Sequence, residues 1–321
     1  MIYNPRAVLV VLFHPPAIDM PRLDVCVCSV FLFFVCLTAP RAVAVPSANQ
    51  DIWRVDLRPV TQLTANEQNF MRLKYYRWAN NRWHPSDAET FFGTQQADIP
   101  LILFALGYSL TTQATTEVGH AIVRHFDPSK PCRIVYWDWY SDMETIKIRR
   151  DLREKIPVAD TAADYLGYFL QKLKPQSKAC LFGFSFGCRI INQAAEVLRR
   201  SGQRPEGLRL HLVIAGSATD QDWFSAGQLH GNVPEITDKI LITHNPDDLS
   251  LKFYPFLYPR RNRTATALGV HGVPIWSVVP EFRDRFENVN VGRYVGRKHE
   301  TLGHVGSAAF QRRINTYFFF E

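Results

Sequence analysis

Short apolar runs that alternate with helix-length segments constrain the fold of this chain more than any other feature. Continuous apolar runs are typical of strands that are buried on both faces of a sheet. Strands that alternate with helices indicate a mainly parallel sheet with helices on both faces. The sequence therefore predicts an α/β fold. The predicted strands are residues 99–106, 132–137, 179–182, 208–215, 239–243 and 289–295.

The predicted helices lie between these strands. Residues 112–126 and 186–200 each follow a predicted strand. Asp160 can cap a third helix, whose apolar residues recur every three or four positions until Pro175 ends it. A closing helix is expected at 308–319. Residues 45–98 are rich in polar and aromatic residues and are expected to hold the first strands.

Composition excludes several classes of protein. The chain has 321 residues, is 46% hydrophobic and 21% charged, and carries a formal charge of +7. These values exclude a largely disordered chain and a polytopic membrane protein. Basic residues mostly alternate with acidic ones, as in Lys147–Lys155. That pattern is typical of a solvated helix face, so we expect no nucleic-acid partner.

The N-terminus has the pattern of a targeting segment. Residues 25–39 are apolar and uncharged, and they are short for a membrane span of ~20 residues but within the usual length of a signal-peptide core. Ala42-Val43-Ala44 follows with small residues at the positions that a signal peptidase reads. We expect a signal peptide at 1–44, with Met20 as an alternative start that would make 1–19 over-extended. The alternative is a membrane anchor at 25–39.

This interpretation predicts a secreted or periplasmic protein whose residues 45–321 form one domain. In the anchored alternative, segment 25–39 makes the only membrane contact. Three cysteines remain in this domain, namely Cys132, Cys180 and Cys188, and their spacing matches no zinc site.

One motif carries chemistry. Gly183-Phe-Ser185-Phe-Gly187 fits G-x-S-x-G, and it directly follows a predicted strand and opens a predicted helix. This is the context of a nucleophile elbow, in which the glycines leave room for a sharp turn that exposes the serine. The backbone N–H of Phe186, at the helix start, would point toward a developing oxyanion.

The chain from about Ile99 onward resembles the α/β-hydrolase superfamily. Within it, the resemblance is to pancreatic-lipase-like and related bacterial serine hydrolases. Three segments carry the resemblance, namely Leu106-Gly107-Tyr108, Val135–Trp139 and Leu181–Gly187. It implies an α/β-hydrolase fold and an oxyanion hole formed by the backbone N–H groups of Phe186 and Tyr108. Leu106 and Phe184 replace histidines of the family pattern, and both side chains shape the pocket, so the resemblance implies the reaction rather than the lipase substrate.

The acid of a catalytic triad should follow the serine and precede the histidine in this fold. The loop after strand 239–243 offers Asp248, which we favour, and Asp247. The loop after the preceding strand, where pancreatic-lipase-like enzymes carry the acid, offers Asp220 and Asp222. Any of these aspartates could instead cap a turn or a helix.

The base should lie between the last strand and the closing helix. This segment contains His299 and His304. A Gly-His step directly before the helix is the common arrangement in the superfamily, so we favour His304.

The superfamily's strand order also places another strand between those of Cys132 and Cys180. Two strand spacings are ~10 Å, which is beyond disulfide reach, so we expect three free thiols.

These residues predict a serine hydrolase that acts on a small-molecule or lipid acyl ester without a metal or organic cofactor. Ser185 would attack the acyl carbon, His304 would transfer the proton, and Asp248 would orient the imidazole. Two alternatives remain open at this point. One is another acyl hydrolase, such as a thioesterase or peptidase. The other is a non-catalytic binding module with the same fold.

Overall fold

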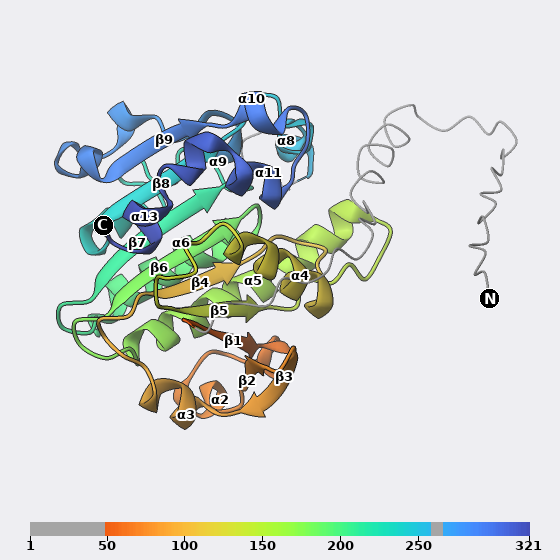
Figure 1. The fold of residues 1–321 in the computed structure, drawn as a ribbon. Coiled ribbons are helices and arrows are strands. Elements are labelled where there is room, and N and C mark those ends of the chain that lie inside the picture. Colours follow the sequence, from red (N-terminus) through yellow and green to blue (C-terminus); the bar gives the residue numbers. More distant parts are fainter. Residues whose placement is uncertain (1–48, 258–265) are drawn as a thin grey trace, which may run out of the picture. The chain divides into compact units, whose positions relative to one another are not determined.

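The computed structural model describes residues 49–257 and 266–321 (Figure 1). The predicted signal peptide or anchor at 1–44 lies outside these residues, so secretion and anchoring stay predictions from the sequence. Among the helices of the described ranges, none combines the length and apolar character that a membrane span requires.

A nine-stranded sheet runs through the described residues in the order β3-β2-β1-β5-β4-β6-β7-β8-β9. Every pair from β1 to β9 in this order is parallel, and β2 is antiparallel to both of its neighbours. The strands are β1 (Gln50–Asp56), β2 (Lys74–Ala79), β3 (Arg82–Ser86), β4 (Leu101–Ala105), β5 (Cys132–Asp138), β6 (Lys178–Phe184), β7 (Arg209–Ala215), β8 (Lys239–His244) and β9 (Phe286–Asn290).

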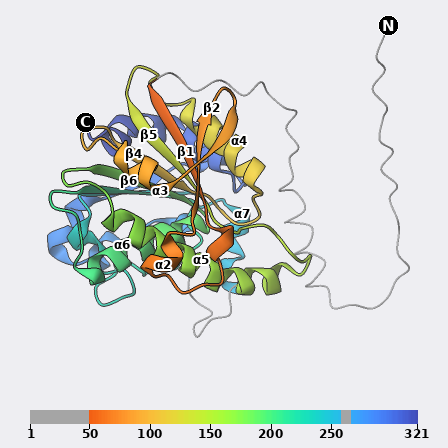
Figure 2. The same cartoon turned by 90° about the horizontal axis from the view of Figure 1, so that it is seen from below.

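Helices cover both faces of this sheet (Figure 2). One face carries α4 (Thr112–Val123) together with α11 (Thr301–Gly306), α12 (Ala308–Gln311) and α13 (Ile314–Phe318). The other face carries α5 (Ile148–Gln171) and α6 (Gly187–Ser201), which pack along each other. The remaining helical segments are short: α2 (Glu67–Phe70), α3 (Ala88–Gly93), α7 (Leu249–Lys252), α8 (Tyr254–Leu257), α9 (Leu268–His271), α10 (Gly292–Val295) and the 3-10 turns Arg58–Val60, Val233–Ile236, Ile275–Ser277 and Pro280–Arg285.

The connections reverse direction between two neighbouring strands. The chain passes from β4 through α4 to β5 on one face, and from β6 through α6 to β7 on the other. The carboxyl ends of β4 and β6 therefore flank the topological switch point of the sheet, which is where open α/β sheets bind ligands. The mainly parallel sheet with helices on both faces confirms the predicted α/β-hydrolase fold.

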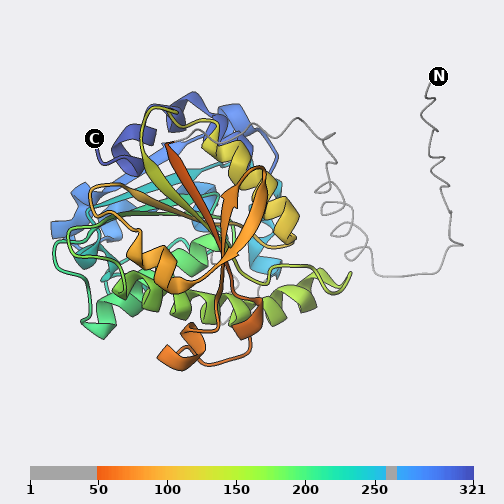
Figure 3. The same cartoon turned by 60° about the horizontal axis from the view of Figure 1, so that its bottom comes forward.

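The first strands, which the sequence could not place, form the edge of the sheet. β1 pairs in parallel with β5, and the β2–β3 hairpin extends the sheet beyond it (Figure 3). The hairpin turn contains Asn80 and Asn81, both with positive φ. Asparagine tolerates this left-handed conformation better than most residues, which is why it is common in such turns.

The prediction that Asp160 caps a helix was wrong. Helix α5 begins at Ile148 and continues through Pro157. Leu152 and Ala159 are buried on either side of the proline, and this packing outweighs the loss of one helical hydrogen bond. The Asp160 carboxylate instead accepts hydrogen bonds from the Arg189 guanidinium of α6, at 2.6 and 2.9 Å.

The C-terminal predictions were right only in part. The last strand ends at Asn290, because Val291 and Val295 are buried around the short helix α10 rather than on a strand. The expected closing helix at 308–319 is divided into α12 and α13, and the separate helix α11 precedes it. Ser307 separates α11 from α12, since its hydroxyl accepts the Phe310 N–H as the N-cap of α12.

Cys132, Cys180 and Cys188 are buried free thiols, as the sequence predicts. Strand β4 lies between the strands of Cys132 and Cys180, and Cys188 lies on α6. Burial raises the pKa of Cys132 and of Cys188 to about 12, which keeps both as unreactive thiols at neutral pH.

Candidate active site

Ser185 occupies a sharp turn between β6 and α6 in a left-handed backbone conformation, with φ at 53°. A non-glycine residue in this region carries strain of order 1–3 kcal/mol. Hydrogen bonds hold the turn on both sides. The Ser185 N–H donates to the Ala215 carbonyl at 3.0 Å, and the Ser185 carbonyl accepts the Cys188 N–H at 3.2 Å.

The two glycines of the motif allow this turn to pack closely. A β-carbon at Gly187 would collide with the carbonyl of Ala105 at the end of β4. A β-carbon at Gly183 would lie 2.8 Å from the Cα of Cys188. Helix α6 thus begins directly against the end of β4, and the serine side chain stands at the carboxyl edge of the sheet.

His299 lies in hydrogen-bond contact with Ser185. Its Nε2 is 2.7 Å from the Ser185 Oγ, and its Nδ1 is 2.6 Å from Oδ2 of Asp248. A carboxylate only accepts hydrogen bonds, so Nδ1 carries the proton and Nε2 is left as the acceptor for the serine hydroxyl. The three side chains form a continuous hydrogen-bonded chain with the polarity that activation of a serine requires.

Asp248 is held rigidly at the end of this chain. It is fully buried, and its Oδ1 accepts the Leu251 N–H at 3.0 Å as the N-cap of α7. Its other oxygen, Oδ2, accepts the hydrogen bond from Nδ1 of His299. The same side chain therefore fills the helix-capping role that the sequence left open and orients His299.

The other carboxylates that the sequence offered do not face the imidazole. Asp220 accepts hydrogen bonds from the Trp223 indole at 3.0 Å and from the Tyr254 hydroxyl at 2.9 Å. Asp247 has a side chain that is 67% exposed. Asp222 is also exposed at the surface.

The expected position of His304 was wrong. His304 is fully buried, and its Nδ1 lies 2.8 Å from the hydroxyl of Thr243 on β8. Burial lowers the pKa of His304 to about 3, which is far from that of an effective base at neutral pH. The prediction assumed that the helix starts after His304. Because α11 starts at Thr301, His304 lies inside the helix and His299 lies in the preceding loop.

Phe184, directly before the serine, packs against both histidines. Its ring centroid is 4.9 Å from that of His299 at an interplanar angle of 32°, and 5.6 Å from that of His304. The apolar ring supports one face of the His299 imidazole. The sequence marked Phe184 only as a departure from the family pattern. Its position at the end of a buried strand, directly before the serine, is the sequence feature that could have identified it as a neighbour of the site.

The two peptide segments expected to bind an oxyanion both lie beside Ser185. Phe186 is the next residue, at the N-terminus of α6. A β-carbon at Gly107 would lie 3.2 Å from the Ser185 Cβ, so the loop that carries Tyr108 passes directly alongside the serine.

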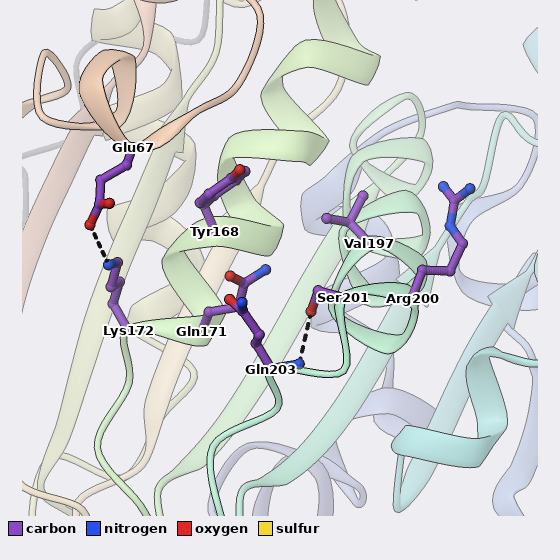
Figure 4. Close-up of a pocket in the computed structure, with 8 residues that line it drawn as sticks. All are labelled: Glu67, Tyr168, Gln171, Lys172, Val197, Arg200, Ser201 and Gln203. Atoms are coloured by element: carbon purple, nitrogen blue, oxygen red, sulfur yellow. Dashed lines mark hydrogen bonds and ion pairs between the residues drawn. The ribbon is translucent and has the colours of Figure 1, made fainter.

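Metal-ligating side chains and a surface pocket are the two further features of the described residues that bear on where a ligand could bind. Within 49–257 and 266–321, no three His, Cys, Asp or Glu side chains are grouped to hold a metal ion. A surface pocket of about 670 Å³ lies between the C-terminal parts of α5 and α6 (Figure 4). Its lining is mainly polar, and an ion pair joins Glu67 and Lys172 across 3.0 Å. It lies at the opposite end of α6 from Ser185 and contains no nucleophile with an adjacent base.

Comparisons with known proteins found similarity in structure only. No family model and no curated protein sequence matches the chain. The catalytic core domain of acetyl xylan esterase from Trichoderma reesei matches at 12% identity and a TM-score of 0.30, over 68% of this chain and 96% of that one. The RedJ thioesterase of prodiginine biosynthesis in Streptomyces coelicolor matches at 13% identity and a TM-score of 0.31, over 73% and 96%.

Carboxylesterase CesB from Bacillus subtilis matches at 14% identity and a TM-score of 0.30, over 70% of this chain and 85% of that one. These TM-scores lie below 0.5. The assignment to the α/β-hydrolase fold therefore depends on the strand order, the reversal of the connections between β4 and β6, and the turn at Ser185.

Proposed function

We propose that the protein is a serine hydrolase that cleaves carboxylic esters through an acyl-enzyme. The hydrogen-bonded chain from Ser185 through His299 to Asp248 carries this proposal. A strained serine at a strand-to-helix turn, a histidine whose unprotonated nitrogen faces the serine hydroxyl and a buried carboxylate are the three parts that nucleophilic acyl transfer needs.

In the proposed reaction, the Ser185 Oγ forms a bond to the acyl carbon while its proton passes to Nε2 of His299. The tetrahedral intermediate then collapses, and the imidazolium donates that proton to the departing alcohol. A water molecule repeats the sequence on the acyl-enzyme and releases the acid. Asp248 holds the imidazole tautomer and stabilises the imidazolium in both halves of the reaction.

The oxyanion of the intermediate would be bound by the backbone N–H groups of Phe186 and Tyr108. One such donor contributes ~3 kcal/mol to transition-state stabilisation. Phe186 is at a helix N-terminus, where the helix dipole also favours negative charge.

The sequence resemblance to ester-cleaving serine hydrolases of the α/β-hydrolase superfamily favours an oxygen ester as the substrate class. Thioesters and activated amides react through the same steps, so a panel of substrates separates these classes. We expect hydrolysis of p-nitrophenyl esters to exceed hydrolysis of matched acyl thioesters and acyl anilides in kcat/KM. The acyl chain is varied within each series.

A fluorophosphonate probe tests the enzyme hypothesis itself. We expect covalent labelling of the folded protein, because the probe reacts only with a serine that a neighbouring base activates. Turnover of thioesters above esters would replace esterase by thioesterase. A folded protein that neither takes the label nor turns over any substrate would be a binding module.

Replacement of the acid should reveal its role. In Asp248→Asn the amide would donate to the imidazole and favour the wrong tautomer, so we expect kcat for a p-nitrophenyl ester to fall by ~10³- to 10⁴-fold. Asp247→Asn is the matched control, since it changes the adjacent, exposed carboxylate, and should stay within about threefold of the wild type. Equal losses in both variants would reject Asp248 as the acid.

A further inference from the structure

We infer that Trp139 is a positioning residue for the oxyanion hole, because its indole contacts both of the chain segments that supply the donors. This inference rests on the proposed function. Trp139 is 2% exposed and follows the end of β5. The sequence singled it out only as part of a family-like strand end.

The first contact is to the loop after β4. The indole N–H of Trp139 donates to the carbonyl of Leu106 at 2.9 Å. This bond fixes the peptide that joins Leu106 to Gly107, which directly precedes the peptide carrying the Tyr108 N–H.

The peptide on the other side of that donor is also fixed. The N–H of Ser109 donates to the Ser141 carbonyl at 2.8 Å, and the Ser141 hydroxyl donates to the Leu110 carbonyl at 2.7 Å. The N–H of Ser141 in turn donates to the Trp139 carbonyl at 2.8 Å. The donor peptide of Tyr108 therefore lies between two peptides that the Trp139–Ser141 segment holds, so its N–H has little freedom to rotate.

The second contact is to the other donor. The Trp139 ring stacks on the ring of Phe186, with centroids 5.8 Å apart and an interplanar angle of 13°. Phe186 supplies the second N–H from the start of α6. One indole thus links the two donors, one of which follows β4 while the other follows β6.

Oxyanion donors act well only when they are held at the position where the charge develops. A displacement of about 1 Å in such a group can cost ~100-fold in rate. A residue that holds both donors should therefore influence the transition state much more than the binding of the neutral ester.

The test measures Trp139→Phe in the full chain, against Trp276→Phe as the matched control. Trp276 is 80% exposed, in the turn Ile275–Ser277. For Trp139→Phe we expect kcat for a p-nitrophenyl ester to fall ~10- to 100-fold while KM changes less than about threefold. The Trp276→Phe variant should match the wild type in both constants.

A trifluoromethyl ketone provides a readout that a purely structural role would not move. The Ser185 Oγ bonds to the ketone carbon while its proton passes to Nε2 of His299, and the former carbonyl oxygen becomes a hemiketal oxyanion in the proposed hole. Its inhibition constant in Trp139→Phe should rise by the same factor by which kcat/KM falls. Unchanged kcat and unchanged ketone affinity in folded Trp139→Phe would overturn the inference.

A second replacement keeps the test valid if Trp139→Phe does not fold. Exchange of Trp139 for β-(3-benzothienyl)alanine preserves the ring and its stacking and removes only the N–H donor. A loss of kcat and of ketone affinity would support the inference, and full activity would overturn it.

Ser185→Ala is measured alongside. If the wild type shows no turnover that depends on Ser185, the proposed function fails. If the wild type shows turnover that depends on Ser185 and the Trp139 variants match the wild type, only the inference about Trp139 fails.

Discussion

Replacement of Ser185 by alanine should reduce ester hydrolysis by ~10⁵-fold or more and remove fluorophosphonate labelling. In the proposed mechanism the serine Oγ forms the acyl-enzyme, so no other group can replace it, and loss of a nucleophile of this kind typically costs about this factor. The fold should be unaffected, because alanine is smaller and the backbone hydrogen bonds of the turn remain. The measurements are kcat/KM for a p-nitrophenyl ester and the circular dichroism spectrum.

Ser201→Ala is the control for this variant. Ser201 lies at the other end of the same helix, where its hydroxyl donates to the Leu198 carbonyl at 2.8 Å. Its removal should leave turnover within about twofold of the wild type. If Ser185→Ala turns over the ester at the wild-type rate, Ser185 is not the nucleophile.

The two histidines should separate the base from its buried neighbour. In His299→Ala we expect kcat to fall by ~10⁵-fold, since Ser185 would lose the imidazole nitrogen that lies 2.7 Å from its Oγ and is placed to take its proton. In His304→Ala, the hydrogen bond to Thr243 and buried packing are lost. That change should lower the free energy of unfolding by ~1–3 kcal/mol and leave turnover by the folded enzyme within about tenfold.

These measurements belong at pH 8, where His304 is neutral in both the folded and the unfolded chain. The folded pKa of about 3 lies below the ordinary value of 6.5. Below pH 6.5 the unfolded chain binds a proton that the folded chain excludes, so His304 lowers the stability as the pH falls toward 3. A turnover defect at pH 8 that is larger in His304→Ala than in His299→Ala would reverse the assignment.

The central part of the fold was predictable because its strands are buried on both faces. Each residue of β4 and β5 is buried. Strands of this kind appear in the sequence as apolar runs, so they can be recognised without knowing which strands they pair with. The start of α5 was not predictable in the same way. Its first turns carry many charges and contain Pro157, and only tertiary contacts show that Leu152 and Ala159 face the core.

The candidate site shows the same division. The G-x-S-x-G spacing identifies Ser185 because the turn needs glycine at two positions within two residues of the serine, and this local requirement is visible as a motif in the sequence. The choice between His299 and His304 depends on where α11 begins, and the uncertainty of a predicted helix end exceeds one helical turn. The sequence favours Asp248 over Asp247 by its position in the loop. The structure adds the physical difference, because the turn after β8 buries the carboxylate of Asp248 and exposes that of Asp247.

Peptide mapping of the fluorophosphonate adduct tests most directly the assignment of Ser185 as the nucleophile and of His299 as its base. The wild type, Ser185→Ala, His299→Ala and His304→Ala are each labelled under initial-rate conditions, digested and analysed by mass spectrometry. We predict an adduct on the Ser185 peptide in the wild type and in His304→Ala, with no label in Ser185→Ala and a rate at least ~10³-fold lower in His299→Ala. An adduct on another residue, or labelling of His299→Ala at the wild-type rate, would contradict the assignment.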